Sequence, residues 1–376
     1  MEFGLFVQAH VPRHEAEADP DDAEHRRLMR ELELAEACDR HGFKYVWSTE
    51  HHFLEEYSHL SAPETFLPYV AARTKQIHVG SAIYNITPPV NHPARIAERV
   101  AMLDHLSEGR FEFGTGRGSS STEFKGFGIP DGDTTREMWD EAIREIVRMW
   151  KETRYSYQGK YFAMPERNVL PKPWSKPHPP LWVACGNPST FEKAARLGLG
   201  ALCFTLGSPA DFEPLIDVYK RNIRNAEPIG DYVNDNVVCV TQLVCAEDGA
   251  EARRISLGMQ GAYHTSLVFR YLDTFPRPKG VPPWPELIPE PSPEELERRI
   301  AAGQRIVGDP EECARGIQKY ADIGCDQLVF GILASTQPQA TALRTVELFG
   351  RHVIPRFDRD PVHRTARMRE AALRKP

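Results

Sequence analysis

Three ionisable residues, Glu50, His51 and His52, stand directly after the apolar segment Phe43–Ser48. Aromatic side chains alternate along this segment, as they do on one face of a buried strand. In an α/β barrel, the carboxyl ends of the strands carry the chemistry. Because a histidine at such a position suits proton transfer or hydrogen bonding near neutral pH, we identify Glu50, His51 and His52 as candidate catalytic residues.

Neighbouring residues of a strand point to opposite faces, so only one histidine of the pair is expected to face the barrel mouth. This spacing argues against a metal site held by both, and the chain contains no HExxH motif. We therefore predict no metal. The alternative for either histidine is a partly buried loop residue whose hydrogen bonds are satisfied and which has no catalytic role.

A glycine-rich segment, Gly114-Thr115-Gly116-Arg117-Gly118, follows a predicted strand. It is not the GxGxxG fingerprint of dinucleotide binding, and we expect no helix directly behind it. Arg117 and Gly118 nevertheless suit a phosphate group, because arginine binds phosphate through two parallel hydrogen bonds and glycine lets the backbone approach closely. The alternative is a surface turn whose arginine pairs with a carboxylate.

The segment Cys185–Thr190 follows another predicted strand and opens a helix. Its backbone N–H groups and polar side chains suit an anion, which makes Gly186, Asn187, Ser189 and Thr190 candidate ligands. Ordinary helix capping by the same residues is the alternative. Two anion-binding loops at strand ends of one barrel indicate a single phosphate-bearing cofactor.

The third predicted strand ends in Ser81-Ala82-Ile83-Tyr84-Asn85. Small side chains at a barrel mouth leave room for a flat ring, and we assign Ala82, Ile83 and Asn85 to the cofactor site. Close packing without a ligand is the alternative reading of the same residues.

The elements that must position these residues alternate along the chain. Strands are predicted at residues 2–9, 43–48, 76–84, 110–115, 180–184, 201–205, 237–245 and 327–332. Helices are predicted at residues 23–40, 63–74, 93–107, 134–151, 188–197, 209–225, 249–258, 310–323 and 338–352. This alternation favours one (β/α)8 TIM barrel over residues 1–376 rather than two doubly wound domains.

Two segments do not fit the alternation. Residues 153–178 contain a predicted hairpin around Gln158-Gly159. Residues 269–293 are rich in proline and aromatic residues and follow neither the helical nor the strand period. Because a long irregular loop in a compact domain is usually a lid or a binding loop, we predict a mobile active-site lid at 269–293.

The composition excludes several classes of function. The 376 residues carry a net charge of −7 without blocks of like charge, which gives no support for nucleic-acid binding. No apolar run approaches the roughly 20 residues of a membrane span, and the N-terminus is not that of a signal peptide. Seven scattered cysteines without a CxxC pair indicate reduced core thiols in a cytoplasmic protein.

Several motifs together resemble the bacterial-luciferase-like flavin-dependent monooxygenase family. The resemblance covers nearly the whole chain and is carried by Trp47–Phe53, His92-Pro93 with Glu98 and Leu103-Asp104, Leu106–Phe111, Gly114–Gly118 and Val307–Glu312. It implies a barrel that binds FMN as FMNH2 at its carboxyl-terminal mouth. It further implies that O2, the co-substrate, forms a flavin peroxide or hydroperoxide that oxygenates a small organic substrate, which we expect to be apolar or aromatic.

The resemblance also implies roles for single residues. His51 matches a catalytic base, Arg117 a phosphate ligand, and Arg136 a second one. The Ala82–Ile83 bond falls where the family has a cis peptide. Because the chain lacks a nicotinamide fingerprint, a separate NAD(P)H:flavin reductase is expected as partner, and the family suggests a homodimer.

Two departures argue against light emission: Gly116 stands in place of a reactive cysteine and Gly186 in place of a glutamate. One alternative is a deazaflavin-dependent oxidoreductase that transfers hydride on the same barrel. Another is a non-catalytic flavin-binding or supporting subunit, although the presence of His51 and Arg117 argues against it.

Overall fold

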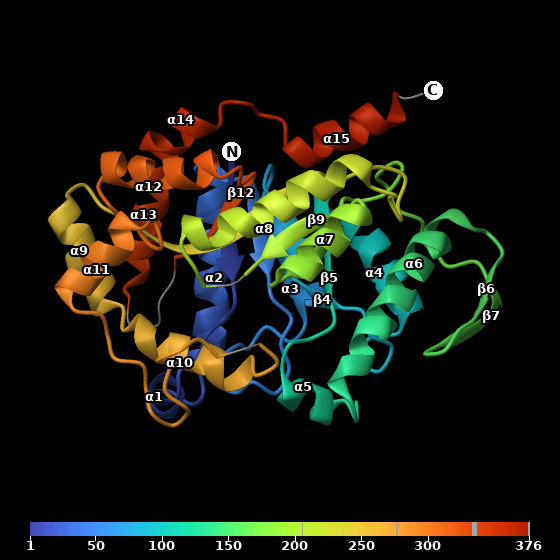
Figure 1. Ribbon diagram of the computed structural model, residues 1–376, viewed down its shortest axis with the longest axis horizontal. Helices are drawn as coiled ribbons and strands as arrows, with labels where there is room; N and C mark the ends of the chain where they lie inside the picture. The colour runs from blue at the N-terminus through green and yellow to red at the C-terminus, as the bar shows by residue number, and fades with distance from the viewer. Residues whose placement is uncertain (205, 276, 333–336, 375–376) are drawn as a thin grey trace.

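The computed structural model of the protein describes residues 1–204, 206–275, 277–332 and 337–374. Within these residues, eight parallel strands close into a barrel, with β12 paired to β1 (Figure 1). Around the barrel the strands are β1 (Glu2–Val7), β2 (Tyr45–Ser48), β3 (His78–Ser81), β5 (Phe111–Gly116), β8 (Leu181–Cys185), β9 (Gly200–Cys203), β10 (Val237–Cys245) and β12 (Gln327–Gly331). The predicted (β/α)8 TIM barrel is confirmed. Thr205, in a predicted strand, and Pro276, in the predicted lid, lie outside the described residues.

The helices that cover the barrel agree with the predicted ones. They are α2 (Ala23–Arg40), α3 (Pro63–Arg73), α4 (Pro93–Leu106), α6 (Thr135–Lys151), α7 (Pro188–Arg196), α8 (Pro209–Asn222), α9 (Gly249–Gly258), α12 (Pro310–Asp322) and α13 (Gln339–His352). Several begin with proline after a capping residue, because proline suits the first turn and the capping side chain satisfies a free backbone N–H. Asn187 and Asp309 cap α7 and α12 in this way.

Further elements were not predicted. They are α1 (Arg13–Ala18), β4 (Tyr84–Asn85), α5 (Ser121–Gly126), the 3₁₀ turns η1 (Gly132–Thr134) and η2 (Ile223–Asn225), α10 (Gly261–Tyr271), α11 (Pro293–Ala301), β11 (Ile306–Gly308), α14 (Ile354–Phe357) and α15 (Arg364–Leu373).

Three of these elements correct the sequence predictions. The predicted strand 76–84 is divided into β3 and β4, and β4 pairs with β5. The expectation that no helix stands behind the glycine-rich loop is wrong, because Ser120 caps α5 immediately after it. The predicted lid begins inside a helix, since α10 extends to Tyr271. The predicted hairpin is present as the antiparallel pair β6 (Tyr155–Gln158) and β7 (Ala163–Arg167).

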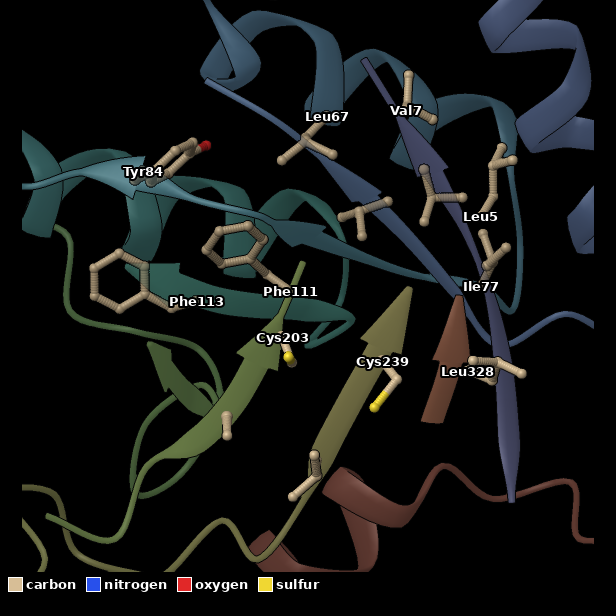
Figure 2. Close-up of a cluster of buried hydrophobic side chains, with 14 of the residues drawn as sticks. Leu5, Val7, Leu67, Ile77, Tyr84, Phe111, Phe113, Cys203, Cys239 and Leu328 are labelled. Atoms are coloured by element: carbon tan, nitrogen blue, oxygen red, sulfur yellow. The ribbon is translucent and has the colours of Figure 1, made fainter. Parts of the chain in front are cut away.

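The larger hydrophobic core lies between the barrel and its helices. Figure 2 shows Leu5 and Val7 of β1 in this core together with Leu67 of α3 and Ile77. All seven cysteines are buried thiols, as predicted, and the described residues contain no disulfide. Cys203 and Cys239 belong to the same cluster (Figure 2). Among the described residues, no helix has both the length and the apolar character needed to cross a membrane.

The barrel interior is filled by aromatic side chains. Trp47 and Trp182 are fully buried, and their rings meet edge to face with centroids 5.2 Å apart. A Cβ atom on Gly80 would lie 2.3 Å from the ring of Trp47, and one on Gly200 2.2 Å from the ring of Trp182. Glycine at these positions therefore makes room for the indoles, and the interior below the mouth is packed solid.

A buried polar cluster closes the amino-terminal end of the barrel beneath these rings. Glu112 of β5 lies 2.7 Å from Nδ1 of His78 and accepts hydrogen bonds from Nε1 of Trp182 at 2.8 Å and from the hydroxyl of Thr365, on α15, at 2.6 Å. Burial raises the pKa of Glu112 to about 8. A neutral carboxyl group can donate a hydrogen bond to the imidazole of His78. Burial lowers the pKa of His78, so its imidazole is neutral as well.

We expect Glu112→Gln to flatten the pH dependence of stability from mildly acidic pH up to about pH 8. Because the folded-state pKa of Glu112 is raised, its contribution to stability is complete below its unfolded pKa and is lost as pH rises through about 8. The glutamine variant has no proton to lose, so its melting temperature should fall less than that of wild type between about pH 6 and about pH 9. Glu227→Gln, at an exposed residue, is the control. Parallel profiles for Glu112→Gln and wild type would contradict the buried neutral carboxyl.

Candidate functional site

A cavity of about 1210 Å³ opens above the aromatic layer, at the carboxyl ends of the strands. Its apolar lining includes Phe6, Ala82, Leu202, Phe204 and Val240. Ligand pockets typically measure about 300–1,000 Å³. The cavity therefore has room for a cofactor and a substrate together.

Glu50 and His51 both line this cavity, whereas His52 lies behind it. Glu50 is buried and accepts hydrogen bonds from the backbone N–H of Asn85 at 3.2 Å and from Nδ2 of Asn91 at 3.1 Å. Its Oε1 lies 3.1 Å from Nε2 of His52. Burial raises the pKa of Glu50. Burial also lowers the pKa of His52, but the hydrogen bond and charge of Glu50 outweigh it, so that this pKa ends above its usual value.

His51 is held by a carboxylate that the sequence analysis did not identify. Glu123, on α5, is 3% exposed, and its Oε1 lies 3.1 Å from Nδ1 of His51 and accepts the backbone N–H of His52 at 3.0 Å. The ring of His51 also meets that of Tyr57 edge to face, with centroids 5.3 Å apart. Because a carboxylate only accepts hydrogen bonds, we assign the His51 proton to Nδ1, which leaves Nε2 as an acceptor.

Two arginines line the cavity, Arg117 in the glycine-rich loop and Arg136 in the first turn of α6. Arg117 donates to the hydroxyl of Thr135 at 2.8 Å and to the carbonyl of Gly132 at 3.4 Å, and no ion pair neutralises it among the described residues. Arg136 lines the same end and pairs with the exposed Asp133 at 3.5 Å. Burial, then the charge of Arg136, lowers the pKa of Arg117. Two neighbouring cations at one end of a cavity favour an anionic ligand.

The start of α7 lines the same end of the cavity through Gly186, Asn187, Ser189 and Thr190. These residues cap the helix, which is the alternative that the sequence left open. Asn187 Oδ1 accepts the backbone N–H of Thr190 at 3.1 Å and the hydroxyl of Ser189 at 2.7 Å. Oγ1 of Thr190 accepts the backbone N–H groups of Gly186 and Asn187 at 3.1 and 3.2 Å. Lys193, one turn further along α7, also lines the cavity and was missed by the sequence analysis.

The peptide bond between Ala82 and Ile83 is cis, as the family resemblance implies. A Cβ atom on Gly116 would lie 2.5 Å from Cγ1 of Ile83, so glycine is needed for these residues to pack as they do. The prediction that Asn85 contacts a ligand is not supported, because its side chain is 3% exposed and does not line the cavity. Its Oδ1 instead accepts from the N–H and hydroxyl of Thr87, at 3.1 and 2.7 Å.

Residues of the predicted lid, among them Leu272 and Phe275, line the cavity, and others contact α5 and the loop before it. Asp273 accepts hydrogen bonds from the backbone N–H and the hydroxyl of Ser121 at 2.8 and 2.5 Å, and Thr274 donates to the carbonyl of Ser119 at 2.9 Å. The ring of Phe275 lies against Gly186, 3.0 Å from where a Cβ would stand. In Figure 1, α5 and α10 lie at the same end of the barrel, opposite α14 and α15.

The profile of the family described as Luciferase-like monooxygenase matches residues 1–327 of the chain. The chain belongs to this family. The chain is 26% identical to limonene 1,2-monooxygenase from Rhodococcus erythropolis, over 96% of the chain and 87% of that protein. It is 31% identical to the oxygenase component of flavin-dependent trigonelline monooxygenase from Acinetobacter baylyi, over 53% of the chain and 52% of that protein. A match of 37% identity to a Sinorhizobium fredii protein likewise covers 51% of that protein.

Solved structures share the fold of this chain. A monooxygenase from Streptomyces bottropensis superposes with a TM-score of 0.79 at 25% identity, over 95% of this chain and 100% of that one. The oxygenating constituent of 3,6-diketocamphane monooxygenase from Pseudomonas putida, in complex with FMN, gives 0.76 at 19% identity, over 94% and 98%. A coenzyme F420 dependent tetrahydromethanopterin reductase from Methanopyrus kandleri gives 0.64 at 20% identity, over 95% and 99%. At these lower identities the likeness concerns the fold alone.

We expect Gly116→Ala to destabilise the protein by about 1–3 kcal/mol, because the added methyl group overlaps the side chain of Ile83. Urea unfolding measures the change. Gly331→Ala is a matched control at the end of β12, since no atom of the described residues lies within 4 Å of where its Cβ would stand. Equal stabilities of the two variants would show that the space between Gly116 and Ile83 is not constrained.

Proposed function

We propose that this protein is a flavin-dependent monooxygenase that uses reduced FMN and O2 to oxygenate a small organic substrate. The observation that carries the proposal is one cavity that has His51, held by Glu123, on one wall and the cations Arg117 and Arg136 at one end. The relatives that are named monooxygenases support oxygen transfer over hydride transfer by a deazaflavin. The relative named as an oxygenase component supports a separate flavin reductase, and the family resemblance suggests a homodimer.

The residues around the cavity fit both the phosphate end and the ring end of FMN. Arg117 lacks an ion-pair partner among the described residues, and a phosphate group would supply one. The first turn of α7 offers a positive dipole end and the polar side chains of Asn187, Ser189 and Thr190 beside it. The apolar floor at Ala82 and Ile83 suits a flat ring. Reduced FMN, when bound, supplies the electrons that activate O2.

His51 would hold or move a proton at Nε2. Its Nδ1 is fixed by Glu123, so the ring cannot rotate without breaking that contact, and the free nitrogen stays available to the cavity. Glu50 and His52 form a second proton-sharing pair one layer behind, which the backbone N–H of Asn85 and the side chain of Asn91 orient. A histidine held in this way contributes general acid–base catalysis, commonly worth about 10²–10⁴-fold in rate.

Residues 272–275 would exclude water from the cavity. Asp273 and Thr274 fasten the segment to α5 and to the loop before it, and Phe275 covers Gly186 at the end with the two cations. Exclusion of water prevents side reactions of reactive intermediates with water and strengthens electrostatic interactions inside the cavity.

We expect Arg117→Ala to weaken FMN binding by about 10- to 100-fold, because a charge-assisted hydrogen bond to phosphate is worth about 1.5–3 kcal/mol. Riboflavin, which lacks the phosphate, should bind the variant and the wild type almost equally. Fluorescence quenching of each oxidised flavin measures both affinities. Arg154→Ala, at an exposed arginine of the hairpin, serves as control. Equal losses for FMN and riboflavin would refute a phosphate site at Arg117.

We expect His51→Ala to keep flavin binding but to lose the coupling of O2 consumption to oxygenation. In stopped flow, the protein is mixed with photoreduced FMN and then with O2, while flavin reoxidation and release of H2O2 are followed. Wild type should reoxidise bound flavin more slowly than free flavin does, and His51→Ala should release H2O2 about 10²-fold faster than wild type. His105→Ala, on the outer face of α4, is the control. Indistinguishable traces for His51→Ala and wild type would remove His51 from the mechanism. If wild-type protein neither retains FMN nor alters its reoxidation, the deazaflavin alternative would be preferred.

A further inference from the structure

The wall of the cavity opposite Arg117 is polar, and the proposed function leaves it unused. Around the barrel, β5 and β8 lie opposite β12 and β1. Arg117, in the loop after β5, and Arg136, in the first turn of α6, are the cations of the proposed phosphate site. The opposite wall includes Arg27 of α2, Gln242 of β10, His264 of α10 and Arg305 before β11.

Arg27 is a buried cation with unused hydrogen-bond donors. It lines the cavity although its side chain is only 3% exposed. Its Nε and Nη1 have no hydrogen-bond partner in the part of the chain that the structure describes. Oε1 of Glu31 lies 3.5 Å from Nε, close enough to hold the guanidinium in place but beyond a well-formed hydrogen bond. Unpaired donors on a buried charge are costly, and a ligand that pairs with them removes that cost.

Arg305 is a second cation at this wall without an ion pair among the described residues. Its Nη2 would lie 3.5 Å from a Cβ on Gly261, the first residue of α10, and Nε2 of Gln242 would lie 3.7 Å from the same point. Burial, then the charge of Arg299, lowers the pKa of Arg305 to about 10, so the group remains charged at neutral pH. The negative charge of the exposed Glu290 acts in the opposite direction and raises the pKa of Arg305. Oε1 of Glu290 accepts the backbone N–H of Ala262.

The first turn of α10 lies beside both arginines, with Gly261 near Arg305 and His264 near Arg27. His264 follows Gly261 by one turn, and the charge of Arg27 contributes to the lowering of its pKa to about 4, after burial. Burial and the neighbouring His264 lower the pKa of His10 to about 2. Both imidazoles are therefore neutral at physiological pH. Arg27, Arg299 and Arg305 line this wall together with the carboxylates of Glu31 and Glu290, so the wall keeps a net attraction for an anion.

We propose that this wall binds a carboxylate group of the substrate through Arg27 and Arg305. This proposal rests on the proposed function, because that function is the reason for regarding the bound carboxylate as part of the substrate. A planar guanidinium matches a carboxylate through two parallel hydrogen bonds, and Gln242 offers a further amide donor. The apolar floor between the two ends of the cavity would hold the remainder of the molecule. The substrate class is therefore an organic acid with an apolar or aromatic body.

The test compares carboxylates with their uncharged primary amides. Hexanoate, decanoate and benzoate, each beside its amide, are titrated into the full-length protein by calorimetry. At least one acid should bind about tenfold more tightly than its amide, because the guanidinium bonds are made only with the charged group. Arg27→Met and Arg305→Met should each abolish this preference. Arg254→Met, at an exposed arginine of α9, should leave it unchanged.

Arg117→Met separates this wall from the proposed phosphate site. Carboxylate preference that persists in Arg117→Met and disappears in Arg27→Met supports the proposal, even if FMN binding fails in every variant. Preference that disappears in Arg117→Met alone would place the anion at the other end and overturn the proposal. Equal binding of acids and amides by wild type would also overturn it, and this comparison does not depend on the folding of any variant.

Discussion

The packing of Trp47 against Trp182 determines where chemistry can occur in this molecule. The two indoles fill the barrel interior because Gly80 and Gly200 leave space for them, so the strands enclose no channel below their carboxyl ends. A ligand can enter only above this layer, where the strands end and their loops begin. Trp182 also donates to Glu112 beneath it, which ties the closed end of the barrel to the floor of the cavity.

Above that floor, the carboxylates contact the histidines, whereas the cations face the cavity. Carboxylates hold both histidines: Glu123 contacts His51 from behind, and Glu50, which itself lines the cavity, contacts His52. Cations face the cavity at two separate places, Arg117 on the side of β5 and Arg27 on the side of β1. A flat apolar floor separates them. The molecule is thus arranged for ligands that are charged at their ends and apolar between, and the cavity volume of about 1210 Å³ admits two of them.

The barrel could be predicted from the sequence because each strand is a short apolar run between helical patterns of regular length. His51 could be predicted because it follows such a run directly. Glu123 could not, since 72 residues separate it from His51 and α5 is too short to show a period. Arg27 was hidden for another reason: it belongs to a charged helix, where an arginine is ordinarily solvated, and only the tertiary packing buries it. Asn85 was assigned to the ligand from its position after a strand, but a local bond to Thr87 turns its amide inward.

The contact between Asp273 and Ser121 joins two parts of the molecule that are otherwise distinct. Ser121 begins the helix that carries Glu123, and Glu123 is the group that orients His51. Any movement that withdraws residues 272–275 from the mouth must first release the start of that helix. The segment at the mouth and the histidine on the cavity wall are therefore connected through one six-residue helix.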